Sequence, residues 1–267
     1  MCLIAFAVGA HPRWRFVLAS NRDEYHARPT ELAAALDANG LRFGGRDAVA
    51  GGGWLQVHAA GRVAAVTNVR LGRAEAAERS RGALVAGFIE GTASAPSFVD
   101  ALLPEAGAYG PFNLLLWDGE AHYLSNHPRP RRRAVGQGVH ALSNADLDTP
   151  WPKTRALQAA LAAWASTAAT TDPRSDAALL DPLFRALADR RTAPDATLPD
   201  TGVPLDWERR LSAAFIVGAD YGTRASTVVL VDDQGLWFEE RRFGPLGAVE
   251  GRSSAWLPRP DASRSLG

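Results

Sequence analysis

The alternation of apolar and polar stretches predicts that the chain opens with a buried β-hairpin. Residues 3–8 and 16–19 are short, uncharged apolar runs, which are typical of strands buried on both faces. The break between them contains Gly9 and Pro12 and suits a turn. An antiparallel hairpin places the start of its first strand beside the end of its second, so Cys2 should lie near residues 21–24.

Later segments predict a mixture of strands and helices. Further strands are expected at residues 54–57, 62–69, 112–117, 122–125, 213–217, 226–232 and 236–243. Helices are expected at residues 80–90, 97–103, 153–167 and 176–189. Residues 192–204 are rich in Pro, Asp and Thr and predict a surface loop.

Two local clusters leave alternatives open. Five glycines indicate either a tight bend between strands or a backbone that lies close to a ligand: Gly44, Gly45, Gly51, Gly52 and Gly53. The arginine cluster at residues 129–133 indicates either a solvated loop or a contact for a ligand phosphate.

Composition indicates one domain over residues 1–257, followed by a flexible tail at residues 258–267. The 267 residues are 46% apolar, which is enough for a large core. Twenty-nine basic residues balance 29 acidic ones, so neither nucleic acid nor a membrane surface is a favoured partner. No apolar segment is long enough to cross a bilayer, and the N-terminus shows no basic region followed by a long apolar segment and a cleavage site, so we expect neither a membrane span nor a secretory signal.

The single cysteine and the scattered histidines bear on location and cofactors. One cysteine cannot form an internal disulfide, so we expect a reducing, cytoplasmic location. The six histidines stand singly and no second cysteine can complete a thiolate site, so we expect neither a metal nor a cofactor.

Cys2 admits two interpretations. A lone cysteine beside Leu3 and Ile4 is commonly a small buried hydrophobe. If Met1 is removed, however, Cys2 carries a thiol and a free α-amine on one Cα, which is a nucleophile with its base attached. The polar residues expected near Cys2, at positions 21–24, favour the second interpretation.

Several motifs occur in order along nearly the whole chain. They are Met-Cys-Leu-Ile at 1–4, Ser-Asn-Arg-Asp-Glu at 20–24, Ala-Gly-Gly-Gly-Trp-Leu at 50–55, Ala-Val-Thr-Asn-Val-Arg at 65–70, Phe-Asn-Leu-Leu at 112–115, Leu-Ser-Asn at 142–144, Trp-Pro-Lys at 151–153 and Tyr-Gly-Thr-Arg at 221–224. With these motifs the sequence resembles the NRDE-motif proteins of the transport and Golgi organisation family. The resemblance implies an α+β fold, a four-layer αββα sandwich of two mainly antiparallel sheets. That fold is similar to the N-terminal-nucleophile hydrolases of the choloylglycine and penicillin V acylase type.

The same resemblance implies roles for residues around Cys2. Arg22 and Asp23 would position the thiolate and the α-amine, and the asparagines at 68 and 144 would supply an oxyanion donor and orient the amine. The remaining expected site residues, which would contact the substrate, are Asn21, Glu24, Trp54 and Arg224. Those acylases usually show Arg-Asn-x-Asp where this chain has Asn-Arg-Asp-Glu at 21–24, so either Asp23 or Glu24 could contact the amine. For Asn68 and Asn144, hydrogen bonding at strand ends is the alternative.

Two functions of different classes follow from the resemblance. The first is a cysteine hydrolase that cleaves an amide or thioester of a small acyl compound through an acyl-enzyme. The second is a carrier that uses the same pocket to bind haem or an acyl-coenzyme A, as the eukaryotic relatives imply. The chain has no Cys-Pro and no Cys-x-x-Cys-His haem motif, and His11 and His127 are the histidines considered as axial ligands.

Overall fold

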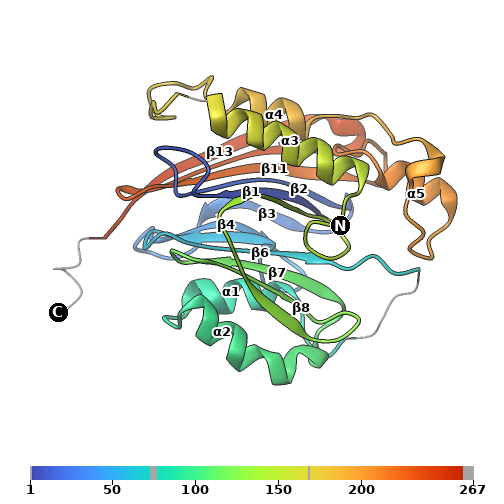
Figure 1. Ribbon diagram of the computed structural model, residues 1–267, viewed down its shortest axis with the longest axis horizontal. Helices are drawn as coiled ribbons and strands as arrows, with labels where there is room; N and C mark the ends of the chain where they lie inside the picture. The colour runs from blue at the N-terminus through green and yellow to red at the C-terminus, as the bar shows by residue number, and fades with distance from the viewer. Residues whose placement is uncertain (1, 73–76, 168, 261–267) are drawn as a thin grey trace.

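The computed structural model describes residues 2–72, 77–167 and 169–260. Two mainly antiparallel sheets lie face to face, and helices cover the outer face of each (Figure 1). The four layers follow the order helix, sheet, sheet, helix. The α+β fold and the αββα sandwich implied by the resemblance are confirmed.

The first sheet carries the hairpin that begins the chain. Its strands lie in the order β10 (Gly138–Leu142), β1 (Cys2–Val8), β2 (Phe16–Tyr25), β11 (Tyr221–Val231), β12 (Gly235–Phe243) and β13 (Val249–Pro258). In the antiparallel register of β1 and β2, Cys2 lies opposite Arg22. The predicted hairpin, and with it the position of Cys2 beside residues 21–24, is confirmed.

The second sheet is formed by the middle of the chain. Its strands follow sequence order: β3 (Thr30–Ala35), β4 (Arg42–Asp47), β5 (Leu55–His58), β6 (Arg62–Asn68), β7 (Phe112–Trp117), β8 (Ala121–Ser125) and β9 (Arg131–Val135). Each strand pairs antiparallel with the next strand in the chain, as in a meander, although α1 (Gly82–Glu90) and α2 (Ala95–Leu102) lie in the chain between β6 and β7.

Helices lie on both outer faces of the sandwich. Helices α1 (Gly82–Glu90) and α2 (Ala95–Leu102) cover the second sheet, whereas α3 (Pro152–Thr167) and α4 (Asp181–Leu187) cover the first (Figure 1). The short helix α5 (Leu205–Leu211) lies at one end of the sheets. Three 3-10 turns complete the helical elements within the described residues: Leu103–Ala108, Asp195–Thr197 and Pro245–Gly247. No helix in the described part of the chain is both long and apolar enough to cross a membrane.

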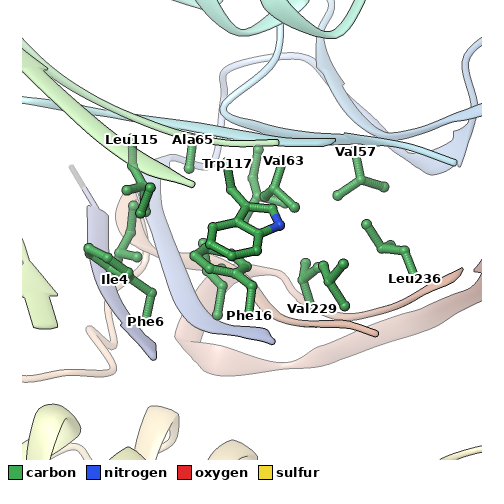
Figure 2. Packing of buried hydrophobic residues seen from close by; sticks show 14 of the residues in the cluster. Ile4, Phe6, Phe16, Val57, Val63, Ala65, Leu115, Trp117, Val229 and Leu236 are labelled. Atoms are coloured by element: carbon green, nitrogen blue, oxygen red, sulfur yellow. The ribbon is translucent and has the colours of Figure 1, made fainter. Parts of the chain in front are cut away.

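The apolar runs of β1 and β2 are explained by burial on both faces of the first sheet. Successive side chains point to opposite faces, so Ile4 and Phe6 join the core between the sheets while Leu3 and Ala5 pack under α3 and α4. Figure 2 shows side chains of both sheets meeting in that central core. There the ring of Phe16 stacks on that of Trp117, with centroids 4.8 Å apart.

Several sequence predictions of secondary structure are wrong. Residues 213–217 form no strand, because their backbone is bonded elsewhere: Phe215 N donates to Asp189 O, and Ile216 N donates to the Thr223 hydroxyl. The helix expected at residues 176–189 is confined to α4, and turns precede it.

The sequence prediction also missed strands at the sheet edges or next to them. The arginines at 131–133 are not in a loop but in the edge strand β9, where exposed charged side chains discourage pairing with another chain. Strands β3, β4 and β13 were not expected either. Strand β13 continues to Pro258, and residues 261–267 of the expected flexible tail lie outside the described residues. The division into one domain and a tail stays a prediction.

Candidate active site

A cavity of about 490 Å³ opens at the end of the first sheet where β1 begins and β2 ends. Its lining includes Cys2, the last four residues of β2, the end of β6, the residues that open α1, and four residues between Val203 and Leu211. Of the residues expected at the site, it is lined by Cys2, Arg22, Asp23, Glu24, Trp54 and Asn68.

Cys2 is held rigidly at this cavity. Its backbone is paired with β2, and its carbonyl accepts a hydrogen bond of 3.0 Å from the Ser143 hydroxyl. Burial raises the pKa of the thiol, and the nearby charge of Arg22 opposes that rise. The thiol is therefore protonated near neutral pH and requires a base before it can act as a nucleophile.

Arg22 lies between the two sheets on the same side of the first sheet as Cys2, because residues opposite each other in a ladder point to one face. Its guanidinium stacks over the Trp54 ring at 4.3 Å, and Nη1 donates to the Thr30 hydroxyl at 3.3 Å. A Cβ at Gly45 would collide with the Trp54 ring. Gly45 thus allows the ring to lie where it supports Arg22.

Asp23 points to the opposite face of the sheet from Arg22, beneath the helical layer. It is fully buried, and its Oδ1 accepts a 2.7 Å hydrogen bond from the Thr223 hydroxyl. Glu24, by contrast, keeps 27% of its side chain exposed, and its Oε1 accepts a hydrogen bond from the backbone of Tyr25. The two acids proposed for the amine contact therefore differ sharply in burial.

The two asparagines expected at the site contact each other, but only one of them lines the cavity. Asn144 Nδ2 donates to the backbone oxygen of Asn68 at 2.8 Å and to its Oδ1 at 3.1 Å. Asn144 is buried and does not line the cavity, whereas Asn68 does. Because the side-chain oxygen of Asn68 accepts this bond, its Nδ2 is the end available to a ligand.

Asn21 and Arg224 were expected to contact substrate, but neither lines the cavity. Asn21 Nδ2 donates to the carbonyls of Leu187 and Ala214 at 2.8 and 2.7 Å, which ties β2 to the helical layer. Arg224 Nη1 donates to three carbonyls of the turn after β2, those of Tyr25, His26 and Arg28. Both side chains support the walls of the site from outside it.

The histidines considered as haem ligands also lie elsewhere. His11 is in the turn between β1 and β2, where its Nδ1 accepts hydrogen bonds from the backbone of Arg13 and Trp14. His127 precedes a cis-proline after β8 and lines a separate hollow. Within the described residues, no group of three or more His, Cys, Asp and Glu side chains is placed to hold a metal ion.

Sequence reasoning missed an apolar wall and a charged rim of the cavity. The wall comes from α5 and the strand behind it, where Trp207 and Tyr221 meet edge to face at 5.6 Å. The rim includes Arg81 and the ion pair of Arg28 with Asp47, which is 2.7 Å long. A helix of seven residues is too short to show a clear hydrophobic periodicity. The only feature of the sequence that indicates α5 is Pro204, which directly precedes the helix.

The chain as a whole matches a known protein family. The family described as Transport and Golgi organisation 2 matches residues 1–245. The chain belongs to this family. Members include the Mus musculus Transport and Golgi organization 2 homolog, which is 30% identical over 262 residues, covering 90% of this chain and 92% of the mouse protein. The Bos taurus homolog is 32% identical with the same coverage.

Solved structures of two hydrolases show that the Transport and Golgi organisation 2 fold is shared more widely. The Caenorhabditis elegans N-acylethanolamine-hydrolyzing acid amidase ortholog has a TM-score of 0.52 at 12% identity, covering 89% of this chain and 99% of that one. The C2A mutant of the conjugated bile acid hydrolase from Clostridium perfringens also has a TM-score of 0.52, at 7% identity, covering 96% of this chain and 92% of that one. At such low identity the likeness concerns the fold alone. The implied N-terminal-nucleophile hydrolase fold is confirmed.

Proposed function

We propose that the protein is a cysteine N-terminal-nucleophile hydrolase that cleaves an amide or thioester of a small acyl compound. The observation that carries the proposal is the position of Cys2, at the start of a rigid strand and on the lining of the cavity of about 490 Å³ at the sheet ends. The proposal requires removal of Met1, which lies outside the described residues. The α-amine of Cys2 is then the base that its protonated thiol needs.

The residues at the cavity suggest a role for each step. The α-amine takes the thiol proton, the sulfur attacks the acyl carbon, and the resulting oxyanion accepts a hydrogen bond from Asn68 Nδ2. The ammonium then returns the proton to the departing amine or thiol, which leaves a thioester on Cys2. Water then attacks that thioester while the α-amine takes a proton from the water. The amine returns this proton to the sulfur of Cys2 as the carboxylic acid leaves, which restores the thiol.

Burial favours Asp23 over Glu24 as the partner of the α-amine. A carboxylate that is fully buried on the helical side of β2 has a fixed position, whereas Glu24 is partly solvated. Arg22, on the other face, would steady the thiolate once it forms. The two faces of one strand would thus serve the amine and the sulfur separately.

A carrier function is the second candidate, and the names of the relatives favour it. The mammalian relatives are named for transport and Golgi organisation rather than for a reaction. An acyl-coenzyme A fits this candidate better than haem does, since His11 and His127 do not line the cavity with Cys2. Under this function Cys2 would be a remnant of the hydrolase fold. The cytoplasmic location expected from the sequence stays a prediction under both functions.

One experiment separates these functions. N-acylethanolamines, conjugated bile acids and acyl thioesters are offered to the wild type and to Cys2→Ala, and intact mass is recorded during turnover. We expect loss of Met1 and at least one activity that Cys2→Ala abolishes, with an acyl adduct on Cys2. Equal ligand binding by both proteins, without any adduct or turnover, would establish the carrier function instead.

A further inference from the structure

Lys153 is the only lysine in this sequence, whereas the other 28 basic residues are arginines. It belongs to the Trp-Pro-Lys motif, to which neither the fold nor the proposed reaction has yet given a purpose. If this single lysine were exposed on the surface, it would need no structural explanation. Lys153, however, has only 5% of its area exposed.

Lys153 lies in the first turn of α3, which packs across β1 and β10 close to the start of β1 (Figure 1). Its Nζ donates to the carbonyl of Leu211, the last residue of α5, at 2.9 Å. Leu211 itself lines the cavity. The ammonium therefore lies just behind the wall of the site, on the helical side of the first sheet, which is also the side to which Asp23 points.

Apart from Arg22, which points between the two sheets, four buried charged side chains act on one another in this region of the described structure: Asp23, Arg70, Lys153 and Glu208. Arg70 and Glu208 form a direct ion pair with each other. A buried charge costs several kcal/mol unless an opposite charge compensates it. Lys153 supplies the second positive charge that balances Asp23 and brings the group to neutrality.

The electrostatic effects on the two residues are reciprocal. Burial raises the pKa of Asp23, and the positive charge of Lys153 is foremost among the effects that oppose this rise. Burial lowers the pKa of Lys153 to about 8, and the negative charge of Asp23 is foremost among the opposing effects. Each group thus helps to keep the other charged.

We propose that Lys153 is a positioning residue that keeps Asp23 ionised behind Cys2, so that Asp23 can hold the α-amine. The inference rests on the proposed function, since only the hydrolase needs that amine. A compact ammonium suits a place with one carbonyl acceptor at hand, because the planar guanidinium of arginine presents five donors. This explains why a lysine occurs here in a chain that otherwise uses arginine.

The unique lysine allows a direct test of the pairing that does not depend on turnover. Protein labelled with 13C-lysine has one Cε resonance, whose titration gives the pKa of Lys153. We expect a value near 8 in the wild type and a value about one pH unit lower or more in Asp23→Asn. Glu24→Gln is the matched control and should leave the pKa of Lys153 unchanged. A titration that Asp23→Asn leaves unchanged would overturn the proposal.

The consequence for Cys2 is measured as the rate of alkylation against pH, in processed wild type and in Lys153→Met. Without Lys153 the pKa of Asp23 should rise, so the acid side of the profile should move to higher pH. Arg155→Met, an exposed change on the same helix, should leave the profile unmoved. If Lys153→Met only lowers the melting temperature while the profile stays in place, Lys153 is a structural anchor and the proposal fails.

Steady-state kinetics on any substrate that is found provides a third test of the role of Lys153. Lys153→Met should lower kcat about tenfold or more with KM nearly unchanged, because it disturbs the amine rather than the cavity wall. If no substrate turns over with any variant, the proposed hydrolase fails, yet the titration still decides whether Lys153 and Asp23 are coupled.

Discussion

Asn144 directs its side-chain amide to both oxygens of Asn68, at 2.8 and 3.1 Å, across 76 positions of sequence. The pair connects the turn after β10 to the end of β6, and only Asn68 lines the cavity. Asn144 therefore orients a neighbour that can meet a ligand. This division of labour makes the two asparagines separable by mutation.

Asn68→Ala should lower kcat by about a hundredfold or more, because it removes a donor to the developing oxyanion. Asn144→Ala should cost less, since Asn68 keeps its amide and loses only its orientation. KM should change little in either variant. Steady-state kinetics on any substrate found for the wild type measures both effects. A larger loss in Asn144→Ala than in Asn68→Ala would reverse the assignment.

Arg22→Met should slow the alkylation of Cys2 at pH 8. The charge of Arg22 lowers the pKa of the buried thiol, so its removal leaves a smaller thiolate fraction. Arg28→Met is the control, because Arg28 lines the same cavity but pairs with Asp47. Iodoacetamide labelling followed by intact mass gives both rates, and equal rates in the two variants would contradict the role given to Arg22.

Asn21→Ala should reduce stability and leave the chemistry of correctly folded protein nearly unchanged. Its amide satisfies the carbonyls of Leu187 and Ala214, and its Oδ1 accepts a hydrogen bond from Ser226. Leaving such buried groups unpaired costs about 1–3 kcal/mol for each group. Urea unfolding measures the loss. A variant as stable as the wild type but devoid of activity would return Asn21 to the site.

Glu240 should make the protein less stable as the pH rises from about 4.5 to 7. Burial raises the pKa of this carboxyl to about 7, against hydrogen bonds from Thr227 and Ala33 and the charges of Arg242 and Arg22. Between its ordinary pKa of 4.5 and that value, the folded protein binds more protons than the unfolded chain. The free energy of unfolding therefore falls with rising pH in this window.

Glu240→Gln is the variant that isolates this effect. Because the pKa of Glu240 is raised from 4.5 to about 7, the wild type should lose roughly 3 kcal/mol more than this variant between pH 4.5 and 7. Urea unfolding of both proteins across the range gives the difference. Parallel pH dependence in the two proteins would show that Glu240 is charged in the folded state.

The hairpin of β1 and β2, and with it the position of Cys2 beside Arg22, follows from the amino-acid sequence alone. These features are local: two short apolar runs, a turn with Gly9 and Pro12, and an antiparallel register leave few alternatives. The order of the motifs also implied the αββα sandwich. That implication came from the resemblance to a family rather than from periodicity.

Which polar residues share the cavity depends instead on how the layers of the fold pack together. Asn21 and Arg224 were expected there on the same grounds as Arg22, but carbonyls from distant segments bind their side chains elsewhere. The strand expected at residues 213–217 is irregular for a similar reason, since the loop at Asp189 and the Thr223 hydroxyl take up its backbone hydrogen bonds. Such contacts depend on which layers meet, and local sequence patterns do not contain that information.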